Sequence, residues 1–325
     1  MTFMRKNPKI QALRGLAIVA VVLIHTCPGG VWQAVIRPFI NFAVPMFVFL
    51  SGYLTKIGAP DWPRTAKKRI WKVIVPYILW CVGYTLLAGG GPRKVFSNLI
   101  TTNAAPHLYY IFVYIQLVLL TPLLGRILKS RYRWIVFVVT PVSAILYKYI
   151  PILSGAAWHR YIPILWNDSC LALLMFYCLG LMLGNGLCVC RAGKKKLAGC
   201  LAVCTVLQIA EGLVLMRLGD ENFGTNAKIT AMLTNTVILL LAQRFLTDDR
   251  VTLEWRLLVR LGDWSFGVYL SHMLILRLLE KIPWFALVPY GINTLAVLAG
   301  SVLLMLVWEK AIGQVHFRGG EKKRS

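Results

Sequence analysis

Long apolar runs separated by short polar connections make up most of the chain. The runs are continuous and do not alternate with a period of two residues, so they predict membrane-spanning helices of about 20 residues rather than strands. We expect ten spans, at about residues 10–26, 32–54, 70–87, 108–128, 134–153, 170–187, 197–216, 229–245, 264–279 and 290–312. The pattern therefore predicts an all-α, polytopic membrane helical bundle. Pro38 and Pro122 predict a kink or boundary within the second and fourth spans.

Lysine and arginine gather in every second connection between these spans. They are frequent before the first span, after the tenth, and between spans two and three, four and five, six and seven, and eight and nine. Cytoplasmic connections of membrane proteins carry this excess, so we expect both termini to be cytoplasmic. The same rule accounts for the net charge of +24 without a nucleic-acid partner.

The composition indicates one membrane domain. Of the 325 residues, 58% are hydrophobic, which is more apolar surface than a soluble domain of this length could cover. The ten spans use most of the chain, so we expect a single integral membrane domain over residues 1–325, in contact with lipid. The first run lacks a signal-peptide cleavage site and Arg14 interrupts it, so we expect a permanent span.

Two ionisable residues mark the first span, in the stretch LRGLAIVAVVLIHTCP. Arg14 and His25 are eleven positions apart, which places them on one helix face and about 16 Å apart along the axis. Arg14 as an interfacial anchor and His25 as a histidine near a helix end are the plain interpretations. A shared polar face across the membrane instead indicates a functional cleft, since ionisable groups within spans usually face protein or water.

Further candidates lie on other spans. Lys68, Arg69 and Lys72 stand at the cytoplasmic start of the third span, where they fit either positive-inside anchoring or the binding of phosphates. His107 and Tyr110 begin the fourth span as part of an aromatic belt or of an acceptor site. His272 is expected near mid-membrane depth, where a histidine is more often functional or hydrogen-bonded than exposed to lipid.

No metal site is expected. Cys188 and Cys190 form a lone C-x-C pair without a second pair of ligands.

The chain resembles the acyltransferase-3 family of membrane acyltransferases. The resemblance rests on IQALRGLAIVAVVLIH, FVFLSGYL, KKRIWKVIVPY, PHLYYIFVYIQLVLLTPLL, MFYCLGLMLG, GDWSFGVYLSHMLIL and WEK, which occur in family order over nearly the whole chain. It implies a bundle of about ten spans in the cell membrane, a cytoplasmic acyl donor such as acetyl-CoA, and an acceptor hydroxyl on the outer side.

The resemblance also assigns roles to particular residues. Arg14 and His25 match the family's paired functional positions, and Arg69 matches a motif usually written with two arginines three apart. Lys72 departs from that motif, because lysine keeps the charge but loses the bidentate fork. The implied mechanism has His25 as the base that deprotonates the acceptor hydroxyl and Arg14 as the residue that orients the donor.

The residues leave several points open. His272, His107 and Tyr110 are expected to contact substrate, although His272 could instead stabilise the bundle. The acceptor could be a surface polysaccharide, peptidoglycan, a lipid-linked oligosaccharide or a small molecule. The sequence does not determine the oligomeric state. The main alternative function is an exporter of a small polar metabolite or amino acid, with the same charged residues along its path. A third possible function, after the enzyme and the exporter, is a non-catalytic membrane anchor or sensor.

Overall fold

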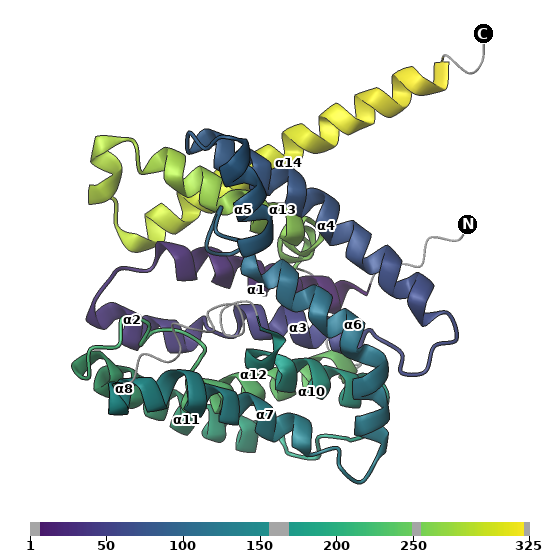
Figure 1. Ribbon diagram of the computed structural model, residues 1–325, viewed down its shortest axis with the longest axis vertical. Helices are drawn as coiled ribbons and strands as arrows, with labels where there is room; N and C mark the ends of the chain where they lie inside the picture. The colour runs from purple at the N-terminus through teal and green to yellow at the C-terminus, as the bar shows by residue number, and fades with distance from the viewer. Residues whose placement is uncertain (1–6, 156–168, 249–254, 322–325) are drawn as a thin grey trace. The chain divides into compact units, whose positions relative to one another are not determined.

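The computed structural model describes residues 7–155, 169–248 and 255–321, with the side chains of residues 312–321 left out. The described residues form helices joined by turns and contain no strand, which confirms the all-α prediction (Figure 1). They divide into two compact units. The first unit comprises residues 1–28 and 253–325, and the second comprises residues 29–252. The single domain expected over residues 1–325 stays a prediction.

The first unit joins the beginning of the chain to its end. It contains α1 (Pro8–Thr26), α13 (Arg256–Leu279), the 3₁₀ helix η5 (Pro283–Leu287) and α14 (Tyr290–Glu321). The side chain of Asn7 caps α1 by accepting a 2.9 Å hydrogen bond from the backbone N–H of Lys9. Each of the three α-helices packs against the other two.

Glycines let α1 and α13 touch backbone to backbone. A Cβ atom at Gly15 would overlap the backbone carbonyl of Leu258, and one at Gly262 would overlap that of Gln11. Small residues permit this close approach between membrane helices, where association depends on van der Waals packing. The pair therefore fixes the helix that carries Arg14 and His25 against the helix that carries His272.

The second unit contains the remaining helices. They are α2 (Val31–Ile36), η1 (Arg37–Phe39), α3 (Ala43–Tyr53), α4 (Trp62–Leu87), α5 (Pro92–Thr101), α6 (Tyr109–Lys129), α7 (Ile135–Ala144), the π-helix η2 (Ile145–Tyr149), α8 (Ile150–Ser154), η4 (Cys170–Ala172), α10 (Leu174–Gly184), α11 (Lys194–Arg217) and α12 (Ile229–Thr247). The principal pairs are α3 with α10, α11 with α12, α7 with α10, and α4 with both α5 and α6.

The α3–α10 pair repeats the glycine contact of the first unit. Cβ atoms at Gly52, Gly180 and Gly184 would overlap the backbone carbonyls of Tyr177, Phe49 and Tyr53, respectively. The predicted motif FVFLSGYL thus packs against MFYCLGLMLG through helix backbones.

Eight of the described helical segments are long and apolar enough to cross a membrane. The other two predicted spans correspond to α10 and α13. The 11 residues of α10 rise only about 16 Å, while α13 is long enough but carries Asp263, Ser271 and His272. The count of ten and the cytoplasmic termini stay predictions. Of the basic residues used for the orientation, residues 5–6, 160, 250 and 322–324 lie outside the described residues.

The two prolines within expected spans have different effects. The run 32–54 is divided at η1, which contains Pro38, so the predicted break there is confirmed. Helix α6 continues through Pro122. The sequence did not predict α5, whose exposed side chains Phe96 and Ile100 lie four residues apart on one face, as in helices that lie along a membrane interface.

Candidate functional site

The two histidines of the first unit lie together. The ring centroids of His25 on α1 and His272 on α13 are 5.0 Å apart, and the rings are inclined at 51°. His25 is half-buried, whereas His272 has 0% exposure. The glycine contact between the two helices explains why rings from opposite ends of the chain can meet. The sequence proposed both residues, but its spacing gave no reason to pair them.

Backbone carbonyls fix a hydrogen on Nδ1 of His272. Its Nδ1 lies 2.7 Å from the carbonyl oxygen of Tyr269 and 3.2 Å from that of Val268. Because a carbonyl oxygen only accepts hydrogen bonds, Nδ1 carries the hydrogen and Nε2 of the neutral ring keeps its lone pair. His272 is thus a buried imidazole with a fixed tautomer beside His25.

The last turn of α1 is held by α14. The hydroxyls of Thr26 and Thr294 are 2.7 Å apart, and the Tyr290 hydroxyl donates a 2.9 Å hydrogen bond to the backbone carbonyl of Leu23. These contacts flank His25 in the sequence, so they restrict the movement of the turn that presents its ring. Arg14 lies half-buried eleven residues earlier on the same unbroken helix.

Of the three basic residues proposed on α4, Arg69 is the one whose side chain packs against its neighbours in the second unit. Its Nη1 donates a 2.6 Å hydrogen bond to the hydroxyl of Thr55, and its guanidinium carbon lies 5.6 Å from the ring centroid of Trp62. Lys68 and Lys72 are exposed. The contact with Trp62 uses the stacking ability that distinguishes arginine from lysine.

A cavity of about 240 Å³ opens beside Trp62. Its lining includes Trp62, Lys56, Arg126 and Lys129, and the three basic side chains are exposed. The positive-inside pattern alone accounts for these cations, so the sequence did not single them out. One available signal was the spacing of Arg126 and Lys129, which places them on one face of a helix. Three cations and an aromatic ring around one opening suit an anionic, ring-bearing ligand.

The segment that lines this cavity is fixed by Asn185, the residue after α10. Its side-chain oxygen accepts a 3.0 Å hydrogen bond from the backbone N–H of Ile57, and its Nδ2 donates a 2.8 Å bond to the carbonyl of Thr55. Thr55 is also the partner of Arg69. Arg69 and the wall of the cavity are therefore parts of one hydrogen-bonded arrangement.

His107 and Tyr110 also belong to the second unit. His107 is 2% exposed, and its ring meets the ring of Tyr84 edge-on at a centroid distance of 5.7 Å. Tyr110 is half-buried, with its ring 6.4 Å from that of Tyr114. The predicted site residues thus divide by unit. Those in the first are Arg14, His25 and His272, and those in the second are Lys68, Arg69, Lys72, His107 and Tyr110.

Comparison with known proteins gives one match. A family model described as an acyltransferase domain matches residues 7–308, which is nearly the whole chain and includes parts of both units. Neither the curated proteins nor the solved structures gave a match.

Proposed function

The chain belongs to the acyltransferase-3 family, and from this membership we propose that it is a membrane O-acyltransferase that uses acetyl-CoA. In this proposal it moves an acetyl group from the cytoplasmic donor to a hydroxyl of a glycan or another acceptor of the cell envelope. The paired rings of His25 and His272, at 5.0 Å, are the observation that best supports a catalytic centre. The multi-pass helical character supports a location in a membrane, and we propose the cell membrane.

His25 serves as the general base. It takes the proton of the acceptor hydroxyl while the hydroxyl oxygen forms a bond to the acyl carbon of the thioester. The carbon–sulfur bond then breaks, and His25 returns the proton to the departing thiolate, so protons and charge balance. His272, with its hydrogen on Nδ1, offers a lone pair on Nε2 that can orient the neighbouring imidazole. Half-burial leaves His25 accessible to a substrate.

In this proposal Arg14 stabilises the negative charge that develops on the thioester and contacts the acyl donor. Negative charge develops on the thioester oxygen as the hydroxyl attacks, and a guanidinium favours that state. The rise of about 16 Å between Arg14 and His25 along α1 suits contact with the extended arm of the donor better than simultaneous contact with one atom.

The phosphates of the donor bind around Arg69, Lys68 and Lys72. The cavity beside Trp62 supports adding Lys56, Arg126 and Lys129 to this set, because coenzyme A carries several negative charges and a purine base. A base can stack on an aromatic ring while the surrounding cations neutralise phosphate oxygens. His107 and Tyr110 contact the acceptor in this proposal.

The family membership does not favour the exporter that the sequence left open. No observation in the described residues gives it separate support, and the same is true of a non-catalytic anchor or sensor.

Transfer of a labelled acetyl group tests the proposal. Purified protein in nanodiscs is incubated with radiolabelled acetyl-CoA and a glycan and lipid extract of the host envelope. We expect label in an extractable acceptor with wild type, and at least about 10²-fold less with His25→Ala. Leu16→Ala, a change at an exposed position of the same helix, should behave as wild type. Full transfer by folded His25→Ala would remove the base assignment, and absence of transfer by folded wild type would count against the enzyme.

A further inference from the structure

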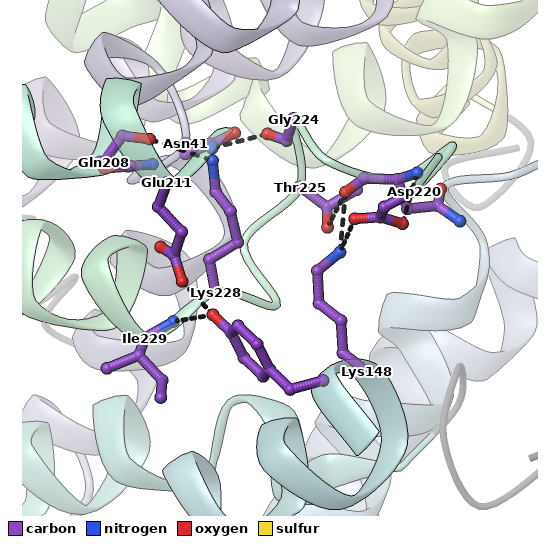
Figure 2. A network of polar contacts seen from close by, with 11 residues as sticks. Asn41, Lys148, Gln208, Glu211, Asp220, Gly224, Thr225, Lys228 and Ile229 are labelled. Atoms are coloured by element: carbon purple, nitrogen blue, oxygen red, sulfur yellow. Dashed lines mark hydrogen bonds and ion pairs between the residues drawn. The ribbon is translucent and has the colours of Figure 1, made fainter. Parts of the chain in front are cut away.

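A fully buried lysine stands at the start of α12. Lys228 is 0% exposed, and its Nζ donates one long hydrogen bond, 3.4 Å, to the backbone carbonyl of Gln208 on α11 (Figure 2). Within the described ranges, no carboxylate lies at ion-pair distance from this ammonium. Burial lowers the pKa of Lys228 to about 8, although the charge of Glu211 opposes that shift. A buried cation in this setting needs further compensation.

The nearby carboxylate of Glu211 is already engaged by other groups. One oxygen accepts a hydrogen bond from the hydroxyl of Tyr149, and the other accepts from the hydroxyl of Thr230 and, at 3.2 Å, from its backbone N–H. The π-helix η2 presents Tyr149 to this carboxylate. Glu211 therefore joins α11 to the first turn of α12 and does not contact Lys228 directly.

The second carboxylate of the cluster is engaged by another lysine. Asp220 forms a 2.5 Å ion pair with Lys148 of η2, and the Lys148 ammonium also donates to the backbone carbonyl of Asn222. The charged groups that act on Lys228 are Glu211, Asp220, Lys148 and Arg37. Both carboxylates are thus engaged by other groups, and the bond to the Gln208 carbonyl is the one that the described residues give to the Lys228 ammonium.

Two amides beside Lys228 have unused hydrogen-bonding atoms. Gln208 is 0% exposed, and neither its Nε2 nor its Oε1 has a partner among the described residues. Asn41 is 1% exposed, and its Nδ2 donates a 2.9 Å bond to the carbonyl of Gly224 while its Oδ1 has no described partner. Figure 2 shows the amide of Gln208 directed toward Asn41 and the end of Lys228. Leaving such groups unpaired in a protein interior is costly.

A glycine keeps side-chain atoms away from the ammonium. Gly212 lies one helical turn after Gln208, and a Cβ there would be 3.1 Å from Nζ of Lys228 and 3.3 Å from Cβ of Ala34. An alanine at position 212 would therefore crowd the end of Lys228.

We propose that Lys228, Gln208 and Asn41 bind a carboxylate group. The Lys228 ammonium and the Gln208 amide nitrogen donate to its two oxygens, and its negative charge compensates the buried ammonium. The amide oxygens of Gln208 and Asn41 accept from a hydroxyl or a water beside the carboxylate. The carboxylate comes from a small free acid or from an acidic sugar. This proposal does not rest on the acyl transfer proposed above.

The test measures thermal unfolding of full-length protein in detergent. Sodium formate, acetate and glucuronate are compared with sodium chloride at equal ionic strength, and glucose is the neutral counterpart of glucuronate. We expect a saturable rise of about 2–4 °C in the unfolding midpoint with at least one carboxylate. A response to formate and acetate alone identifies a small free acid, and a response to glucuronate identifies an acidic sugar. If no carboxylate raises the midpoint beyond the chloride and glucose controls, the proposal is overturned and the site binds water only.

Variants locate the effect. Lys228→Met and Gln208→Leu should each abolish the carboxylate-dependent rise, whereas Arg217→Met, which removes an exposed cation from the same helix as Gln208, should keep it. A rise that persists in folded Lys228→Met would place the carboxylate elsewhere and overturn the proposal. If Lys228→Met does not fold, wild type and Gly212→Ala are each titrated with ¹³C-formate, and binding is followed by NMR. We expect saturable binding by wild type and at least about tenfold weaker binding by Gly212→Ala, and equal affinities would overturn the assignment.

Discussion

His25 and His272 come from opposite ends of the chain, yet their rings lie 5.0 Å apart. The backbone carbonyls around Nδ1 of His272 fix which of its nitrogens can accept a hydrogen bond. In the proposed mechanism His272 positions the ring of His25, and its two nitrogens can be tested separately.

Substitution of His272 by asparagine or by glutamine tests its two nitrogens separately. Asparagine can replace the Nδ1 donor that holds the backbone carbonyls, and glutamine places an amide nearer the position of Nε2. We expect His272→Gln to keep more of kcat than His272→Asn, with an unchanged KM for acetyl-CoA. Removing a positioning contact should cost about 10–10²-fold in kcat. Steady-state kinetics with both variants give the answer. If His272→Asn is the more active of the two, the role of His272 is confined to its backbone contacts.

The cavity beside Trp62 should affect donor binding rather than turnover. The double variant Arg126→Gln/Lys129→Gln removes two cations from its lining. We expect about a tenfold or larger rise in the KM for acetyl-CoA, steeper at low salt, with kcat changed little. Arg131→Gln removes an exposed charge just beyond α6, outside the cavity lining, and should leave KM unchanged. Equal KM values for the double variant and wild type would place the donor elsewhere.

Arg69 and Lys72 should differ in importance. Arg69 is half-buried and bonded to Thr55, whereas Lys72 is exposed. We expect Arg69→Lys to weaken acetyl-CoA binding by about tenfold, because lysine cannot reproduce the fork or the contact with Trp62. Lys72→Ala should have the smaller effect. Isothermal titration of both variants measures this, and the reverse order would assign the main phosphate contact to Lys72.

The glycine contact between α1 and α13 should be intolerant of a methyl group. Gly15→Ala and Gly262→Ala place a Cβ against a backbone carbonyl, so the two helices must separate. We expect destabilisation of about 1–3 kcal/mol and loss of acyl transfer. Gly83→Ala in α4 is the matched control, because a Cβ there has no neighbour within 4 Å. It should be neutral or stabilising by up to about 1 kcal/mol. Normal stability and transfer in Gly15→Ala would show that the contact is dispensable.

Stability should depend on pH through Lys228. Its folded pKa of about 8 lies below the ordinary value of 10.5, so between these limits the unfolded chain binds more protons than the folded one. Stability contributed by this group therefore rises as pH increases from 8 to 10.5, by at most about 1.4 kcal/mol per pH unit. The surrounding titratable groups are Glu211, Tyr149, Asp220, Lys148 and Arg37.

Comparing Lys228→Met with wild type isolates the pH-dependent contribution of Lys228 to stability. Unfolding midpoints measured from pH 7 to 10 should rise less with pH in the variant. The rise in the unfolding midpoint that a carboxylate causes should decrease with pH. The protonated amine of Lys228 binds the anion, and this amine loses its charge above pH 8. Parallel pH curves for wild type and variant would assign the titration to another group.

The sequence predicted most helices because long apolar runs in a membrane protein permit few alternatives. The sequence did not indicate how short α10 is, nor the presence of α5. Helix α10 is only 11 residues long within a longer apolar run, and α5 has too few apolar residues to resemble a span. Charge counting could not separate Arg69 from Lys68 and Lys72, since only the structure shows which side chain reaches Thr55.

The buried cluster around Lys228 shows the same limit more strongly. In the sequence, Lys228 lies in a polar connection where a lysine is normally solvated. Only the packing of α11 and α12 and the turn that carries Asn41 removes it from water. Likewise, the pairing of His25 with His272 depends on a contact between helices from opposite ends of the chain, for which one sequence contains no distance information.

The contact between Gly15 and Leu258 has a consequence for biosynthesis. The ribosome makes α1 first, but its partner α13 emerges only after the whole second unit, which is continuous in the chain. The second unit can assemble while α1 waits in the membrane without its partner. The histidine pair is completed only by the last helices to be inserted, so nascent chains that stop before α13 contain the cavity beside Trp62 but lack the paired histidines.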